Sequence, residues 1–397
     1  METSPLLTTL VIALSTALVG AAVATRLQLS PILGYVMAGI AIGPFTPGPV
    51  GNVATVQELA DIGVVLLMFA VGLELPLREL LAAGWRALGG GIAQVGVVLA
   101  GGLGLGTALG WPPVEALFFG AVAAISSTAV LTKLLAEYGE TESAHGRLVL
   151  AWGSAQDVLT VLLMLVLSAL ATGHEGLGRE LALAGVKGAA FVVLIVVLGG
   201  FVLPRVLSAV HALRSRELFA LMVAVVALGT AYGAAFFGLS VALGAFLAGM
   251  AVSESDLSHE VAKEIAPLRD LFAGLFFVSV GMLLNPAFIV AHLGLILLGL
   301  GLIVVVKGAI VMGLLAAVRV PRPTAVRSGL LLAQSGEFSF LLARLGTERG
   351  AVSEDVFSIM LASAVGSIIT APLLYRLVVA RELSGQRDEA TVASPSA

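Results

Sequence analysis

Residues 288–318 read FIVAHLGLILLGLGLIVVVKGAIVMGLLAAV, a run in which Lys307 is the single Lys, Arg, Asp or Glu. A helix of about 20 apolar residues spans the ~30 Å hydrocarbon core of a bilayer. Similar runs recur along the chain, which is 59% hydrophobic and 12% charged, whereas soluble domains carry roughly 25% charged residues. Because lipid cannot satisfy backbone hydrogen-bonding groups, recurring runs of this length predict helices. We therefore expect an all-α polytopic membrane protein.

Breaks at Pro, Gly and charged residues divide the chain into about thirteen expected transmembrane helices, each near the length that a bilayer requires. The second and the ninth are short. The expected spans are 6–25, 31–43, 56–75, 87–109, 114–136, 146–172, 184–208, 217–237, 239–253, 268–284, 288–318, 325–346 and 354–380. The first lacks the basic residues that open a signal peptide, so we expect it to be retained.

Basic residues are distributed unevenly over the loops between these spans. Of the 21 Lys and Arg residues, all but five fall on one side; Arg179, Lys187, Arg344 and Arg349 fall on the other, and Lys307 lies within a span. Cytoplasmic loops carry an excess of Lys and Arg. The pattern predicts a bacterial-type inner (plasma) membrane protein whose N-terminus is outside and whose C-terminus is cytoplasmic.

The two halves of the chain share short sequence matches at a nearly constant offset of about 210 residues. The matching pairs are Leu33-Gly34 with Leu243-Gly244, Ala38-Gly39 with Ala248-Gly249, Asp61 with Asp270, and Val71-Gly72 with Val280-Gly281. Equivalent spans lie an odd number of helices apart, so the second copy has the opposite orientation in the membrane. Inverted-topology repeats recur in secondary transporters, with the substrate site near the bilayer midplane. We predict this construction here.

Asp157 lies near the centre of the sixth expected span, in the segment WGSAQD of residues 152–157. A central Asp costs about 2.5–3.5 kcal/mol on insertion scales, so such a residue is a functional candidate by default. A carboxylate there can bind either a proton or a dehydrated monovalent cation, and exclusive occupancy is all that exchange requires. Gln156 offers a neutral carbonyl oxygen, a ligand type that hard cations prefer. The alternative is a structural Asp satisfied by hydroxyls or by a lysine.

Lys307 lies in the middle of the eleventh expected span, too deep to reach the interface easily. We expect it to act at the ion site as the partner or competitor of an acidic group. The alternative is an ion pair that only holds helices together.

Two clusters of small polar residues lie within the fifth and twelfth expected spans, at equivalent repeat positions. They are Ser126-Ser127-Thr128 and Gln334-Ser335-Gly336-Glu337. Such clusters indicate interrupted helices, whose exposed ends favour ions. The three residues of the first cluster are therefore candidate ion ligands. Glu337 is expected either to neutralise positive helix ends or to pair with Lys307.

Other features bear on alternative functions. The net charge of −4 predicts no nucleic-acid partner, and the absence of cysteine excludes disulfides and thiolate metal sites. His174-Glu175 and His259-Glu260 lack the second histidine of a helical zinc site, and no Gly-Lys-Ser/Thr occurs. We therefore expect neither an enzyme nor a cofactor. The five histidines are expected in solvated loops, and Asp61 is expected either to face water or to line an ion pathway.

These segments resemble the monovalent cation:proton antiporter superfamily, in the branch of the glutathione-gated potassium/proton antiporters and related bacterial Na⁺/H⁺ antiporters. The similarity covers residues 6 to 381. Its most specific segments are FAVGLEL at 69–75, Gln156-Asp157, LFFVSVGM at 275–282 and AQSGEF at 333–338.

The resemblance implies a transmembrane antiporter domain over residues 1–383 that forms a homodimer. A core with crossing broken helices 5 and 12 is expected to move against a dimerising scaffold like an elevator, with Asp157 binding the ion and Lys307 as the embedded basic residue. The expected ranges are 87–172 and 288–381 for the core, 6–75 and 217–284 for the scaffold, 184–208 for a linker helix and 384–397 for a polar tail.

The sequence differs from the superfamily's sodium exchangers, which carry two adjacent acids and are typically electrogenic. Here Gln156 precedes Asp157, as in potassium-handling members, so the resemblance favours K⁺ over Na⁺ and leaves the stoichiometry open. Many potassium-exchanging relatives carry a C-terminal nucleotide-binding regulatory domain. Only the short polar segment 384–397 follows the last expected helix, so we expect no such fused domain in this chain.

We therefore predict a secondary active transporter that exchanges K⁺ or Na⁺ for H⁺ by alternating access around Asp157. The alternatives are an Na⁺/H⁺ antiporter of the same fold, a cation-coupled symporter and a passive cation channel. No Thr-Val-Gly-Tyr-Gly filter sequence occurs, which argues against a potassium channel.

Overall fold

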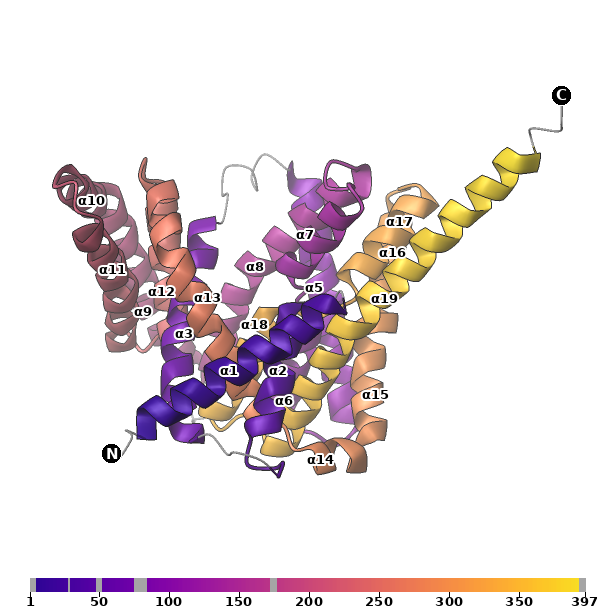
Figure 1. Ribbon diagram of the computed structural model, residues 1–397, viewed down its shortest axis with the longest axis horizontal. Coiled ribbons are helices and arrows are strands. Elements are labelled where there is room, and N and C mark those ends of the chain that lie inside the picture. Colours follow the sequence, from indigo (N-terminus) through magenta and orange to yellow (C-terminus); the bar gives the residue numbers. More distant parts are fainter. Residues whose placement is uncertain (1–4, 28, 48–51, 75–83, 172–176, 393–397) are drawn as a thin grey trace. The chain divides into compact units, whose positions relative to one another are not determined.

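In the computed structural model, the described residues are 5–27, 29–47, 52–74, 84–171 and 177–392. Helices dominate these ranges, which contain no β-strand, and this confirms the predicted all-α class (Figure 1). Two compact units share the chain: Met1–Ala82, Val161–Ala291 and Leu345–Val352 form unit 1, whereas Ala83–Thr160, His292–Arg344 and Ser353–Ala397 form unit 2. Each unit combines segments that are far apart in the sequence.

Unit 1 contains both long and short helices. Its elements are α1 (Pro5–Arg26), α2 (Pro31–Ile42), α3 (Val53–Glu74), α9 (Leu177–Val197), the π-helical turn η1 (Leu198–Val202), α10 (Leu203–Ala212), α11 (Arg216–Phe236), α12 (Val241–Ser253), α13 (Ser258–Met282) and α14 (Pro286–Ala291). Helix α3 packs against both α12 and α13.

Unit 2 contains two helices that stop and restart. Its elements are α5 (Gly84–Ala108), α6 (Pro113–Ala124), α7 (Thr128–Glu137), α15 (Leu293–Gly301), the π-helical turn η2 (Leu302–Val306), α16 (Lys307–Ala317), α17 (Arg322–Leu332) and α19 (Glu354–Val392). Two further helices, α8 (Ala144–Ala171) and α18 (Glu337–Glu348), belong to unit 2 up to Thr160 and Arg344.

Local sequence signals set several helix starts. Helices α2 and α6 begin at Pro31 and Pro113, where the missing N–H is not needed for an intrahelical bond. The Ser127 and Ser240 hydroxyls cap α7 and α12 by accepting the N–H groups of residues 130 and 243, each at 3.2 Å.

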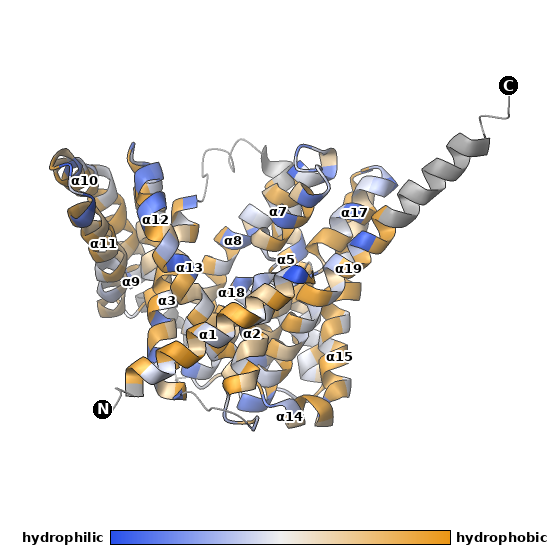
Figure 2. Cartoon of the chain, viewed as in Figure 1, coloured by the Kyte–Doolittle hydropathy of each residue, from blue (hydrophilic) through white to orange (hydrophobic). Residues whose placement is uncertain are grey.

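Ten helical segments of the described residues are long and apolar enough to cross a membrane, and Figure 2 shows the hydrophobic residues along the helices in orange. The count of thirteen spans stays a prediction. At three places the helices of the structure differ from the expected spans. Helix α13 begins at Ser258, ten residues early, because its first turns are polar and escape a search for apolar runs. The span expected at 288–318 is divided among α14, α15, η2 and α16.

The third difference is at the C-terminal end, where the expected span 354–380 matches the apolar segment Glu354–Val379 but the helix continues beyond it. Helix α19 continues to Val392, so most of the polar segment expected as a tail from residue 384 is helical, and residues 393–397 lie outside the described ranges. The residues after 380 are rich in Glu, Arg, Gln and Ala, which are good helix formers. They extend the helix although they are too polar for a membrane span.

Glycines let the helices of unit 1 pack backbone against backbone. A Cβ on Gly39 of α2 would overlap the Val278 carbonyl oxygen of α13, and one on Gly281 would overlap that of Val36. Helices α3 and α12 repeat the arrangement, because a Cβ on Gly72 would meet Phe246 O and one on Gly249 would meet Phe69 O. Small residues at such crossings allow the close contact that membrane helices use.

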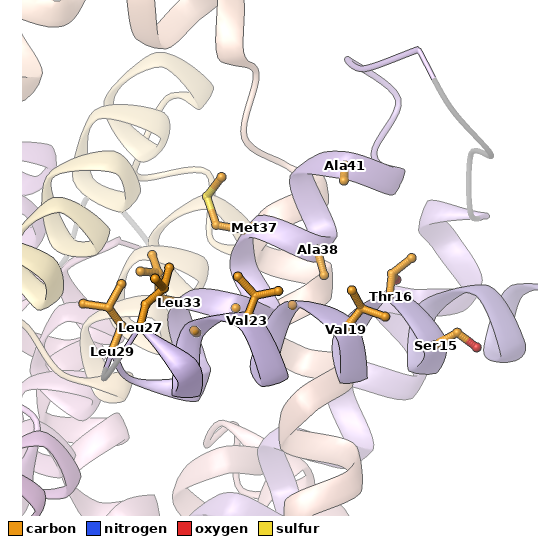
Figure 3. A pocket seen from close by; sticks show the side chains of 13 residues that line it. Ser15, Thr16, Val19, Val23, Leu27, Leu29, Leu33, Met37, Ala38 and Ala41 are labelled. Atoms are coloured by element: carbon orange, nitrogen blue, oxygen red, sulfur yellow. The ribbon is translucent and has the colours of Figure 1, made fainter.

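Helices α1 and α2 also cross closely, since a Cβ on Gly20 or Gly34 would overlap the other glycine's carbonyl oxygen. An apolar groove of about 550 Å³ runs along this pair (Figure 3). Its walls include Val19, Val23 and Met37, whose side chains are mostly exposed.

We predict that Gly39→Ala destabilises unit 1, because the new methyl group would force α2 away from α13. Overpacking of this kind costs about 1–3 kcal/mol, so the melting temperature of the purified protein should fall by several degrees. Gly229→Ala is the matched control: Gly229 lies on α11, and a Cβ there meets nothing within 4 Å. Equal melting temperatures for the two variants would contradict the prediction.

Candidate functional site

The first helix interruption lies between α6 and α7, where Ile125–Ser127 is non-helical. Ile125 and Ser127 have extended backbones, with ψ of 137° and 115°. Serine hydroxyls compete for backbone groups and so favour such breaks. All three residues are buried, so their polar groups need partners within the protein.

The second interruption lies between α17 and α18, at 333–336. A Cβ on Gly336 would come within 2.9 Å of the Ser126 carbonyl carbon and the Ser127 nitrogen. Only glycine leaves room there, so the two interruptions cross backbone against backbone. Hydrogen bonds between the two segments are numerous, because both segments are buried.

Side chains of each interruption bind the backbone of the other. Ser127 N donates to Gln334 Oε1, and Gln334 Nε2 donates to Ser127 O, both at 3.1 Å. Ser126 Oγ donates to Leu332 O, the last carbonyl of α17, at 2.8 Å. On the other side, Ser339 Oγ donates to Val122 O near the end of α6, also at 2.8 Å. The two broken helices are therefore joined into one hydrogen-bonded body.

Lys307 is fully buried, with 0% of its surface exposed. Its Nζ donates to Ile125 O at 3.1 Å and to Gln334 O at 2.9 Å, one carbonyl from each interruption. Both of these bonds go to backbone carbonyls, and the expected role of Lys307 beside an acidic group stays a prediction. The carbonyls that follow α6 and α17 carry the negative ends of the helix dipoles and attract the ammonium group.

Glu337 compensates the opposite helix ends. It stands in the first turn of α18, and its Oε2 accepts the Ser127 hydroxyl at 2.9 Å, next to the start of α7. A carboxylate near two helix N-termini is stabilised by their positive dipole ends. Of the two roles expected for Glu337, the structure therefore favours neutralisation of the helix ends.

Asp157 is the exception in this network. Only 6% of its surface is exposed. The Thr128 side chain hydrogen-bonds to it, but Oδ1 is buried without a partner, the one carboxylate oxygen of that kind in the part of the chain that the structure describes. Glu337 is near enough to act on it electrostatically. A buried carboxylate oxygen without a donor is costly, so the site is suited to a proton or a cation.

Gln156 supports the first interruption. Its Oε1 accepts Ser126 N–H at 2.7 Å, and its Nε2 donates to Gln94 Oε1 at 2.5 Å. Gln94 Nε2 in turn donates to Ala124 O at 3.0 Å. The predicted role of Gln156 as an ion ligand stays a prediction, since its carbonyl oxygen already holds a backbone N–H group.

Sequence reasoning missed three residues of this network. Gln94 is the only amide side chain in the apolar helix α5. That isolation was the only feature of the sequence that could have marked it as part of the site. Ser367 Oγ accepts Ser335 N–H at 2.9 Å, and Ser339 binds Val122 O. Single serines occur widely in membrane helices bonded to their own backbone, so nothing in the sequence separates these two.

A second buried polar cluster lies where α7, α8, α17 and α19 meet. Glu140 accepts hydrogen bonds from Tyr375 and Arg327, and its Oε2 lies 3.1 Å from His145 Nε2. Burial acts to raise the pKa of Glu140, but the bonds from Tyr375 and His145 and the Arg327 charge together hold it below its ordinary value of 4.5.

The expectation that all five histidines are solvated was wrong for His145, which is 6% exposed. This residue lies in the first turn of α8 beside Ser143 and Glu140, and the distant Tyr375 also contacts it, which its position in the sequence does not reveal. His211 and His259 are exposed and His292 is half-buried, whereas His174 lies outside the described residues. Asp61 is exposed on α3, and neither of its expected roles is tested.

Comparison with known proteins identifies a matching family and several relatives. A family model for the transmembrane sodium/hydrogen exchanger matches residues 13–380. The cation/proton antiporter YbaL of Escherichia coli is 38% identical over 383 residues, covering 94% of this chain and 69% of YbaL. The K⁺ efflux antiporter KefB of Alkalimonas amylolytica is 35% identical, but this chain spans only 55% of its length. The chloroplastic K⁺ efflux antiporter 2 of Arabidopsis thaliana is 36% identical, and this chain spans 29% of its length.

The same arrangement of helices occurs in a solved structure. The sodium proton antiporter MjNhaP1 of Methanocaldococcus jannaschii superimposes with a TM-score of 0.69, covering 94% of this chain and 98% of that one. The sequences are 15% identical, so this likeness concerns the fold alone.

The lowered pKa of Glu140 predicts a pH-dependent stability. Its ionised form is favoured in the folded state, so the stabilisation is complete above pH 4.5 and is lost as pH falls through the lower, folded-state pKa. We predict that Glu140→Gln lowers the melting temperature at pH 7 and flattens its decline below pH 4.5. Glu142→Gln is the control, because Glu142 is exposed and pairs with Arg147 only at 3.9 Å. A Glu140→Gln curve parallel to the wild-type curve would contradict this reading.

Proposed function

This chain belongs to the sodium/hydrogen exchanger family, and on that basis we propose that it exchanges a monovalent cation for H⁺ through Asp157, with K⁺ favoured over Na⁺. The observation that carries the proposal is the buried Asp157 carboxylate, whose Oδ1 has no partner beside two crossing broken helices. The relatives are named as antiporters, which fits a transporter rather than an enzyme.

The coupling follows from the cost of an unneutralised carboxylate. Lys307 and Glu337 already compensate the helix ends, so no bonded charge is left to balance Asp157. Either H⁺ or a metal cation would do so, but not both at once. If the site moves across the membrane only when Asp157 is neutralised, each cation carried one way is matched by a proton carried the other way.

Potassium is favoured because the site holds a single free acid. The residue before Asp157 is the neutral Gln156, and no group of three or more acidic or His side chains suited to a metal ion occurs in the described ranges. Few charges and several neutral oxygens suit a large, weakly hydrated ion better than a small one. The names of the K⁺ efflux relatives support the same choice. The second candidate is Na⁺/H⁺ exchange at the same site.

An inverted repeat is part of the proposal. Its support in unit 1 is a matched set of glycine crossings: Gly39 meets Val278 O, and Gly249 meets Phe69 O. Gly249 follows Gly39, and Val278 follows Phe69, by about 210 residues in each case. In unit 2, Gln94 binds Ala124 O as Lys307 binds Gln334 O. These correspondences would arise if two copies with opposite topology formed both units.

We further propose that unit 2 is the moving core and unit 1 the scaffold of an elevator-type homodimer in the inner membrane, with the N-terminus outside. The support is that Asp157, Lys307 and both interruptions belong to unit 2 and are bonded to one another. A site whose ligands come from one compact unit can travel with that unit.

A symporter and a channel are the rival transport functions. A symporter would move protons with the cation, and a channel would pass cations without any proton movement. The direction of proton flux on adding a cation separates a symporter from an antiporter, and the presence of proton flux separates a channel from an antiporter.

We predict that Asp157→Asn abolishes proton movement driven by K⁺, because the amide can neither lose a proton nor neutralise a cation. The measurement is the internal pH of proteoliposomes on addition of Na⁺, K⁺, Li⁺ or Rb⁺ separately. Asp256→Asn, which changes an exposed Asp between α12 and α13, should exchange like the wild type. Retained exchange in Asp157→Asn would remove the site assignment.

If Asp157 alone carries both ions, exchange is one for one and electroneutral. We therefore predict that the initial rate in proteoliposomes is unchanged when a membrane potential of either sign is imposed. A rate that depends on the potential would mean that a second group, with Lys307 as the candidate, also gains and loses a proton in the cycle.

A further inference from the structure

We propose that Gln94 is a positioning residue for the exchange reaction, a role that rests on the proposed function of Asp157. Gln94 lies on α5 and is fully buried. It touches neither Asp157 nor Lys307 by any hydrogen bond, but acts through Gln156 on the first interruption. The two glutamines form a clamp on the peptide segment 124–126.

The clamp has one allowed polarity. Ala124 O can only accept, so Gln94 must present its Nε2 there, at 3.0 Å. Gln94 Oε1 is then turned to Gln156 and requires a donor, which is Gln156 Nε2 at 2.5 Å. This leaves Gln156 Oε1 for Ser126 N–H at 2.7 Å. The Ala124 carbonyl thus sets the orientation of the Gln94 amide, which in turn sets that of Gln156. The Ser126 N–H group then supplies the donor that Gln156 Oε1 requires.

The clamp determines where the Ile125 carbonyl points. Residues 124 and 126 are held by the two glutamines, and the carbonyl between them is the one that receives Lys307 Nζ at 3.1 Å. The next residues, Ser127 and Thr128, bind Glu337 and Asp157. A shift of this short extended segment would move the partners of all three charged residues together.

Gln94 also explains why residue 156 is neutral in this chain. A carboxylate at 156 could still accept Ser126 N–H, but its second oxygen would face Gln94 Oε1, and two acceptors repel. Residue 94 would then have to donate both to Ala124 O and to residue 156, which glutamine cannot do in this geometry. Lysine could, because its ammonium group has three donors. The identities of residues 94 and 156 are therefore coupled.

The test uses the full chain in proteoliposomes, with the rate of K⁺-driven proton movement and the half-saturating K⁺ concentration as readouts. Gln94→Leu and Gln156→Glu should each slow exchange about tenfold, the effect of losing roughly 1.4 kcal/mol of positioning, and should raise the half-saturating concentration. The double variant Gln94→Lys with Gln156→Glu should recover at least half of the lost rate, because it restores all the donors.

Ser363→Ala is the matched control. Ser363 is a fully buried residue of unit 2 whose hydroxyl binds a backbone carbonyl, Ile296 O at 3.1 Å, away from the interruptions. It should exchange like the wild type. Wild-type rates in Gln94→Leu, or a double variant no better than the worse single one, would overturn the proposal.

Amide hydrogen exchange separates this proposal from the proposed function. In Gln94→Leu, exchange at residues 124–128 should become at least tenfold faster than in the wild type and in Ser363→Ala, whether or not the protein moves potassium. Unchanged exchange in that segment would overturn the role of Gln94. A wild type that moves no protons on addition of any cation would overturn the proposed function and leave the hydrogen-exchange result to decide the role of Gln94.

Discussion

Two helices stop and restart inside an apolar layer, and the backbone groups released there cannot turn to water. This constraint accounts for most of the polar residues at the site. The carbonyls that end α6 receive Ser339, Gln94 and Lys307, while those that end α17 receive Ser126 and Lys307 again. Buried carbonyls and N–H groups left unpaired would each cost about 1–3 kcal/mol. The polar side chains at the interruptions therefore stabilise the non-helical backbone by pairing with these groups.

Asp157 stands apart because it is not needed for that purpose. The helix ends are compensated by a cation at the carbonyls and an anion at the N–H groups, and the residues that bridge the interruptions are bonded to one another. What remains is a carboxylate that the protein buries and leaves partly unsatisfied. An open carboxylate oxygen of this kind is what the proposed acceptance and release of an ion would require.

The sequence predicted those features that are encoded locally. Apolar runs such as 288–318 indicated the helices, the Ser126–Thr128 and Gln334–Glu337 clusters marked the places where two of them are interrupted, and a central Asp identified the candidate site. The rest depends on contacts between distant segments. Lys307 was expected to act as the partner or competitor of an acidic group, but its bonds to two backbone carbonyls could not be predicted, because carbonyls carry no mark in a sequence. His145 is buried because Tyr375 and Glu140 surround it, and Gln94 gains its role only from Gln156, which lies on another helix.

The ammonium group of Lys307 occupies a place that a dissolved metal ion could fill in a protein without it. Two carbonyl oxygens from different segments converge on it, as they would on a bound sodium or potassium ion. The cation at this place is part of the Lys307 side chain, so it cannot diffuse away. If the proposed function holds, an ion that enters from solution finds the Ile125 and Gln334 carbonyls already bound to Lys307, so the Asp157 carboxylate is left as its chief ligand.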